Sequence, residues 1–177
     1  MATLVWEAAE DAADRLRKNY QTSDGLVDLD AICAAYDIQV LHTARLPEGT
    51  SGMIVKKDKD TPARVYVNAN ESRERQRFTL AHEIGHYMER LTVAGDASYS
   101  FRDKRGGAYD LHEFYADQFA GALLMPKERV VELNPGLRAD PLSLKLAAID
   151  IAQQFGVSPS AAEKRLERLV KQGDIAG

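Results

Sequence analysis

The chain has a single cysteine, Cys33, among its 177 residues, so no disulfide can form within it. It also lacks a long apolar run, because no stretch approaches the length that a membrane span requires. Residues 1–7 carry neither a basic segment nor a sustained apolar one, which is not the pattern of a secretory leader. These absences predict a cytoplasmic protein without a membrane partner.

An excess of positive charge is missing as well. The sequence has 23 Lys and Arg against 27 Asp and Glu, and its formal net charge is −4. This balance argues against general nucleic-acid binding, although it leaves room for a local basic patch. No glycine-rich phosphate loop follows a predicted strand, and no internal repeat is present. A hydrophobic content of 45% is enough for one sizeable core, so we expect a single domain.

Histidine is scarce too, yet two of the four histidines lie in one short motif. Residues 82–86 read His-Glu-Ile-Gly-His within an apolar-periodic stretch. Positions i and i+4 of a helix share a face, so His82 and His86 can hold one metal ion with Glu83 beside it as a candidate general base. This spacing is typical of zinc-dependent metallopeptidases. Chance would produce it in about one in a few hundred sequences of this length, so further ligands must be found.

A catalytic zinc site needs a third protein ligand if the fourth position is to hold water. Glu113 is the strongest candidate, because residues 112–126 have helical periodicity and end at a proline. Asp117 follows one turn later, where it could accept a hydrogen bond from the second ring nitrogen of a ligand histidine. Both carboxylates could instead be helix N-terminal acids favoured by the dipole. The alternative ligands are few: Cys33, His42 and His112.

Other residues near these motifs have more than one interpretation. His112 points about 100° away from Glu113 on a helix, so it is either a proton donor or a partly exposed polar residue. Gly85 costs about 1 kcal/mol in a helix interior, which indicates close approach of another backbone or a tolerated glycine. We expect His42 to be structural and Cys33 to be a small buried apolar residue.

The remaining N-terminal part predicts a mainly helical α+β fold. Residues 4–19 form an amphipathic helix with Thr3 as a plausible N-cap, and Asp28 could cap a second helix that runs to Tyr36. Residues 39–42, 52–56 and 64–68 are short β-prone runs that suggest a small antiparallel sheet beside the metal-binding helix. Residues 52–55 could be an edge that holds an extended peptide by strand addition, or part of a plain structural hairpin.

Residues 92–110 are polar and contain Gly95, Gly106 and Gly107, which predicts a loop near the cleft. Some of its side chains could help to stabilise an oxyanion, although solvated surface positions are the simpler interpretation: Arg102, Lys104, Arg105 and Tyr109.

The C-terminal part predicts two helices, residues 141–155 and 159–171, with Ser158 as the N-cap of the second. This is the outline of a helix-turn-helix. Residues 141–177 carry five Lys or Arg against four Asp or Glu, a net charge of +1, whereas a DNA-reading unit normally has a clear basic stripe. We therefore expect this pair to cover the catalytic core or dock a substrate protein, and we do not expect direct DNA binding.

Two segments together resemble a known family. Residues 75–87 read RQRFTLAHEIGHY, and residues 113–126 read EFYADQFAGALLMP. They are similar to the ImmA/IrrE-type metallopeptidases of bacteria and their mobile elements, as are residues 51–55, 65–68 and 155–159. The resemblance spans about residues 29–169. Arg90 is one departure, since many members have a further histidine there, but that position is not a zinc ligand in the family.

The resemblance implies a minimal gluzincin-like metallopeptidase fold, with Zn²⁺ held by His82, His86 and Glu113 and with Glu83 as the general base. It also implies a DNA-binding repressor as the usual type of substrate. We therefore predict a zinc endopeptidase that cleaves a helix-turn-helix repressor to relieve repression. The alternative is a zinc-bearing module that sequesters a transcription factor without efficient cleavage. The expected parts of the single domain, residues 1–177, are an N-terminal helix (1–27), a catalytic core (28–135) and a helical extension (141–177).

Overall fold

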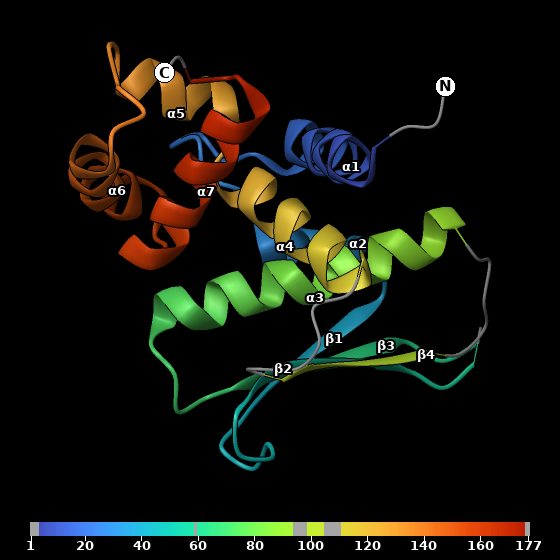
Figure 1. The fold of residues 1–177 in the computed structure, drawn as a ribbon. Helices are drawn as coiled ribbons and strands as arrows, with labels where there is room; N and C mark the ends of the chain where they lie inside the picture. Colours follow the sequence, from blue (N-terminus) through green and yellow to red (C-terminus); the bar gives the residue numbers. More distant parts are fainter. Residues whose placement is uncertain (1–3, 59, 94–98, 105–110, 176–177) are drawn as a thin grey trace.

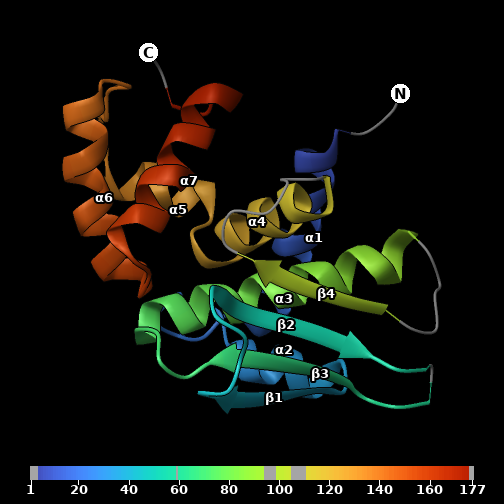
Figure 2. The same cartoon turned by 60° about the horizontal axis from the view of Figure 1, so that its bottom comes forward.

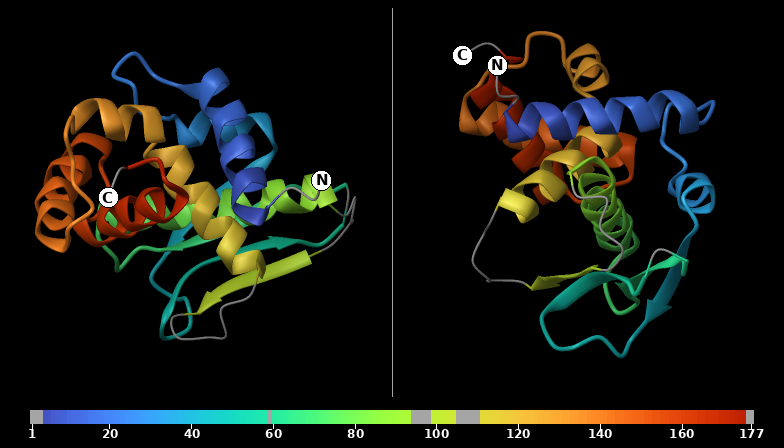
Figure 3. Two further views of the ribbon diagram at one scale, coloured as in Figure 1. Left: turned by 45° about the horizontal axis from the view of Figure 1, so that its top comes forward. Right: turned by 90° about the vertical axis from the view of Figure 1, so that its right-hand side faces the viewer.

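The computed structural model describes residues 4–58, 60–93, 99–104 and 111–175. Its elements follow the order α1 (Val5–Tyr20), α2 (Leu29–Ala35), β1 (Ile38–Thr43), β2 (Thr50–Lys56), β3 (Ala63–Asn68), α3 (Arg73–Val93), β4 (Tyr99–Lys104), α4 (Leu111–Leu124), α5 (Lys127–Leu133), α6 (Pro141–Phe155) and α7 (Pro159–Gln172). Helix α3 lies on the sheet, α4 crosses above α3, and α1 lies on the far side of α4 (Figures 1 and 3). The fold is α+β and mainly helical, as the sequence predicted.

The four strands form one mixed sheet with the order β1-β3-β2-β4 (Figure 2). Strand β2 is antiparallel to both of its neighbours, whereas β1 and β3 are parallel. The prediction of an antiparallel sheet was therefore wrong at β1. Strand β3 follows β2 and pairs with it in the antiparallel sense, and its other edge pairs with β1. Strands β1 and β2 run in opposite directions, so β3 is parallel to β1.

Strand β2 is interior to the sheet, so the prediction that residues 52–55 form a peptide-binding edge was wrong. Strand β4 pairs with β2 from Thr50 to Lys56 and covers that edge. Part of the predicted loop between the metal helices is thus a strand, and it contains Arg102 and Lys104. The other residues singled out in that loop lie outside the described residues: Gly95, Arg105, Gly106, Gly107 and Tyr109.

Helix α3 begins after Ser72, whose Oγ accepts a hydrogen bond from the Arg75 N–H at 3.2 Å and so satisfies one of the first-turn donors. It packs on β2 and β3, and the helix and these strands share one buried apolar core, which includes Leu80, Ala81 and Ile84 on the helix and Ile54, Val65 and Val67 on the strands. This packing fixes the position of α3 relative to β2, and with it the position of the motif at residues 82–86.

The two N-terminal helices end close to the predicted residues, but one cap differs. The N-cap of α1 is Leu4, whose N–H donates to Glu7 Oε2 at 3.1 Å, and Thr3 lies outside the described residues. The Asp28 cap of α2 is confirmed, because its carboxylate accepts from the Ala31 N–H at 2.9 Å. Helix α2 ends at Ala35, one residue before the predicted end.

The predicted C-terminal helices are confirmed. Ser158 caps α7 by accepting from the Ala161 N–H, and Gly156 ends α6 in the left-handed region with φ of 62°. Helix α7 packs against α4 and joins the same buried apolar cluster as α1, α3 and the sheet. Helix α5 was not predicted. None of the helices in the described part of the chain is long and apolar enough to cross a membrane.

Gly85 lies where α4 approaches α3 closely, which agrees with one of the two interpretations of this glycine. A Cβ added at Gly85 would lie 3.0 Å from Ala116 Cα and 3.0 Å from Phe119 Cδ1. We expect Gly85→Ala to lower the free energy of unfolding by about 1–2 kcal/mol, because overpacking outweighs the gain of about 1 kcal/mol in helix propensity. Urea denaturation measures this difference.

Gly121 provides the matched control, since a Cβ there would make ordinary contacts of 3.5 Å to Arg165 Cδ and 3.9 Å to Arg168 Nη1. Gly121→Ala should therefore keep or raise the stability. A Gly85→Ala variant as stable as the wild type would contradict the close-approach explanation.

Candidate metal centre

The structure brings the two histidines of the motif against the first turn of α4. His82 and His86 lie one turn apart on α3, with ring centroids 4.7 Å apart, and both side chains are buried. Nε2 of His82 lies 3.3 Å from Glu113 Oε2, and Nε2 of His86 lies 3.3 Å from Glu113 Oε1. The potential ligand atoms of these three residues are all within 4.8 Å of one another.

This donor set fits a divalent metal ion. Two imidazole nitrogens and a carboxylate match the three protein ligands of catalytic zinc sites, which leave a fourth position open. Each Nε2 lies 3.3 Å from a different oxygen of Glu113, and a bound metal ion would replace these direct contacts by bonds of about 2.0–2.1 Å to the same side chains. The three side chains converge closely enough to share one metal ion.

Asp117 fixes the orientation of the His82 ring. Its Oδ1 lies 3.0 Å from His82 Nδ1, and because a carboxylate can only accept, Nδ1 carries the proton and Nε2 faces Glu113. The position of Asp117 agrees with the prediction that it accepts a hydrogen bond from a ligand histidine. Asp117 itself is contacted from α7: Arg168 Nη1 donates to its carbonyl oxygen at 3.1 Å, and Nη2 lies 3.5 Å from Oδ2.

The ionisable groups of the cluster change one another's pKa values. Burial opposes a charge on His82, but the hydrogen bonds to Asp117 and Glu113 outweigh it and raise the pKa of His82 to about 10. Burial likewise opposes ionisation of Glu113, yet its contacts with His82 and His86 hold the pKa of Glu113 far below its usual value. Burial lowers the pKa of His86. A metal ion can bind Nε2 of His82 only when that nitrogen carries no proton, so we expect metal affinity to rise with pH.

Glu83 lies on the side of α3 that faces strand β2, and its side chain is fully buried. Gly52 makes room for it, because a Cβ added at Gly52 would lie 3.0 Å from Glu83 Oε1 and 2.4 Å from Thr79 Cγ2. The register between β2 and β4 shifts between Thr50 and Gly52, next to this contact. Glu83 is also close enough to His82 to raise the pKa of that histidine. The carboxylate thus lies beside the cluster, as a general base requires.

The other candidate ligands lie elsewhere. His42 Nδ1 pairs with Gln76 Oε1 at 2.8 Å on the surface, and His112 Nδ1 lies 2.9 Å from Glu89 Oε1 with its side chain about half exposed. Cys33 is in the core, where burial raises the pKa of its thiol to about 12, so it is a buried apolar residue as expected. Among the described residues, the ligand cluster consists of His82, His86 and Glu113.

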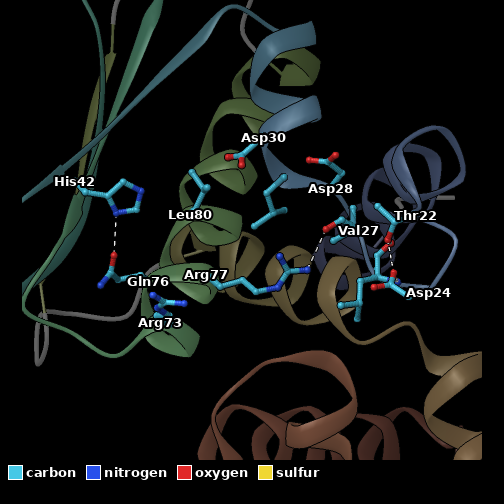
Figure 4. A pocket seen from close by; sticks show the side chains of 12 residues that line it. Thr22, Asp24, Val27, Asp28, Asp30, His42, Arg73, Gln76, Arg77 and Leu80 are labelled. Atoms are coloured by element: carbon cyan, nitrogen blue, oxygen red, sulfur yellow. Dashed lines mark hydrogen bonds between the residues drawn. The ribbon is translucent and has the colours of Figure 1, made fainter.

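A separate pocket of about 460 Å³ lies between the α1–α2 connection, α2, β1 and the start of α3 (Figure 4). Hydrogen bonds tie its walls together: Arg77 Nη2 donates to the Val27 carbonyl at 3.0 Å, and His42 contacts Gln76. Burial lowers the pKa of Arg77. The lining of this pocket includes no residue of the metal cluster, so it contributes no group to the chemistry there.

We expect the purified protein to bind one divalent metal ion per chain. Removing one ligand from a three-ligand site should abolish or greatly weaken binding, so His82→Ala, His86→Ala and Glu113→Ala should each lose the metal. Metal analysis of each purified variant measures this, and His112→Ala is the matched control that should keep a full complement. Full retention of metal by Glu113→Ala would remove Glu113 from the ligand set.

Sequence reasoning missed two residues of this site, Gly52 and Arg168. Gly52 had a signal, since a glycine inside a strand often marks a close approach, here by α3. No feature of the sequence pointed to Arg168, because an arginine on an amphipathic helix is usually a surface residue.

Comparison with known proteins agrees with the geometry. The model of the IrrE N-terminal-like domain, which defines a family of peptidases, matches residues 33–167. A search of curated protein sequences finds no match at a significant level. The matched region contains both helices of the metal cluster and most of α7. The chain therefore belongs to the IrrE N-terminal-like family of metallopeptidases.

Proposed function

We propose that this protein is a zinc-dependent endopeptidase that cleaves a protein substrate at a specific site. The observation that carries this proposal is the convergence of two buried imidazoles and one carboxylate next to a fully buried glutamate on the same helix. Two histidines with one carboxylate form a common ligand set of zinc peptidases, which supports zinc as the metal. The family is one of metallopeptidases, which supports hydrolysis of a peptide bond.

Each residue has a role that follows from its position. His82, His86 and Glu113 would hold the zinc ion, which, when bound, polarises the scissile carbonyl and makes water more acidic. Glu83 takes the proton from the attacking water onto its carboxylate and then delivers it to the nitrogen of the leaving amine. Asp117 keeps Nε2 of His82 turned towards Glu113. The chain supplies its own base, so the proposed reaction requires no further cofactor.

An extended substrate would bind at the edge of the sheet nearest the cluster. In the part of the chain that the structure describes, β4 is the outer strand on this side, because the order is β1-β3-β2-β4. The backbone of β4 could pair with a substrate strand, which gives affinity from main-chain hydrogen bonds. This assigns to β4 the role that the sequence had suggested for residues 52–55.

We further propose that the substrate is a helix-turn-helix transcriptional repressor and that cleavage relieves repression in the cytoplasm. This step rests on the resemblance to ImmA/IrrE-type metallopeptidases. The acidic balance of the chain also favours a protein substrate over DNA. Two arginines of α7, Arg165 and Arg168, point into the protein, which further weakens the case for α7 as a DNA-reading helix.

Co-expression with candidate repressors encoded near this gene tests the proposal. With the wild type we expect a discrete repressor fragment and increased output from the repressed promoter, and with Glu83→Gln we expect neither. Immunoblotting measures the repressor length, and a reporter gene measures promoter output. Derepression by both forms with the repressor intact would instead favour a sequestering module. Sequence-specific binding of promoter DNA by this chain alone would favour a direct regulator.

A further inference from the structure

Arg168 connects the C-terminal helix α7 to the metal centre through Asp117. Its Nη1 donates to the Asp117 carbonyl oxygen at 3.1 Å, and its Nη2 lies 3.5 Å from Oδ2 of the same residue. The other carboxylate oxygen, Oδ1, lies 3.0 Å from His82 Nδ1. The Asp117 carboxylate therefore stands between a guanidinium and an imidazole, with one oxygen for each.

We propose that Arg168 is a positioning residue for the metal centre, which acts through Asp117 on the ring of His82. The proposal rests on the proposed function only in taking His82 as a metal ligand. It gives the helix-turn-helix-like extension a definite role, because α7 then completes the outer contacts of the site that α3 and α4 build.

The geometry shows how a contact from α7 helps to orient Asp117. The terminal torsion of an aspartate is broad, so a contact on Oδ2 further narrows the orientation in which Oδ1 faces His82. The guanidinium of Arg168 contacts both the main chain and the carboxylate of Asp117, so it restrains the residue at two points. Asp117 and Arg168 are mostly buried, and their side chains are 25% and 19% exposed, so solvent screens the contact only in part.

The position of α7 on α4 is itself fixed one turn earlier. Arg165 Nε donates to the Met125 carbonyl oxygen at 3.1 Å, and its Nη1 donates to Glu10 Oε1 at 2.5 Å. Both arginines lie over Gly121 of α4, since the position of a Cβ there is 3.5 Å from Arg165 Cδ and 3.9 Å from Arg168 Nη1. Arg168 is therefore presented to Asp117 by a helix whose place is set independently of the metal.

The test measures Zn²⁺ affinity by competition with a chromophoric chelator. Loss of a contact that orients a ligand typically weakens metal binding about 10- to 100-fold, and we expect this for Arg168→Gln. Arg168→Lys should also bind more weakly, because the single nitrogen of an ammonium cannot reproduce the two guanidinium nitrogens that each face one group of Asp117. Lys164→Gln is the matched control on the exposed face of α7 and should bind like the wild type.

A double-mutant cycle separates positioning from general support of the fold. If Arg168 acts through Asp117, then Arg168→Gln combined with Asp117→Asn should bind Zn²⁺ no more weakly than Asp117→Asn alone. The absorption spectrum of the Co²⁺-loaded protein should change in Arg168→Gln and Arg168→Lys and not in Lys164→Gln. Thermal unfolding of the metal-free forms identifies any variant that fails to fold, and Arg168→Lys then carries the test.

Unchanged Zn²⁺ affinity in both Arg168 variants would overturn the proposal, as would fully additive losses in the double variant. A wild type that binds no Zn²⁺ would instead overturn the proposed function, and this inference with it, so the two failures are distinguishable.

Discussion

Glu83→Gln is expected to keep one metal ion per chain and to lower the rate of peptide-bond hydrolysis at least about 100-fold, because an amide cannot take the proton from water. Glutamine matches glutamate in size, which matters at a fully buried side chain beside Gly52. The substitution should lower kcat. Single-turnover cleavage of the substrate, with metal analysis of the same samples, measures both quantities.

The matched control is Glu74→Gln, the same substitution at an exposed position in the first turn of the same helix. It should hydrolyse substrate at the wild-type rate. Activity of Glu83→Gln within tenfold of the wild type would assign the base to another residue. Loss of metal in this variant would show that Glu83 supports the ligands and would leave its role as a base without support.

Arg165→Ala should lower the free energy of unfolding by about 3–5 kcal/mol, because it leaves the buried carboxylate of Glu10 without its counterion. Arg165 and Glu10 are both buried, and their ion pair joins α7 to α1. This loss is a large part of the total stability of a typical domain, about 5–15 kcal/mol. Urea denaturation of the metal-free protein measures it.

Replacement of both partners provides the control. Arg165→Met combined with Glu10→Leu should recover most of the lost stability, since removing both charges also removes the cost of burying them. Lys164→Ala, an exposed cation on the same helix, should change stability by less than about 0.5 kcal/mol. An Arg165→Ala variant that is as stable as Lys164→Ala would show that the buried pair contributes nothing.

The metal-ligand cluster could be predicted because most of its geometry is local. The spacing of His82 and His86 is set by the pitch of one helix, and Glu113 and Asp117 share a face of the next. The part of the geometry that is not local is the contact between helices α3 and α4. Gly85 was consistent with such a contact but also with a tolerated glycine, and only the structure shows that α4 comes close to it.

The sheet was predicted less well, because strand order is set by non-local pairing. The run from Ala63 to Asn68 indicated a strand, but nothing in it shows that it inserts between β2 and β1. The run from Tyr99 to Lys104 contains Arg102, Asp103 and Lys104, and its polar composition hid a strand that pairs with β2. Arg165 was hidden for a related reason, because burial of an arginine depends on a distant Glu10.

The contact between Glu10 and Arg165 joins residues that are 155 positions apart, and this separation orders the events of synthesis. At about 5–20 residues per second, Glu10 leaves the ribosome about 8–30 s before Arg165 does. During that interval α3 and α4 can pack together while α1 still carries a charge without its counterion. The nascent chain therefore closes its fold last at α7, and until then α1 can pack on α4 without the ion pair that joins it to α7.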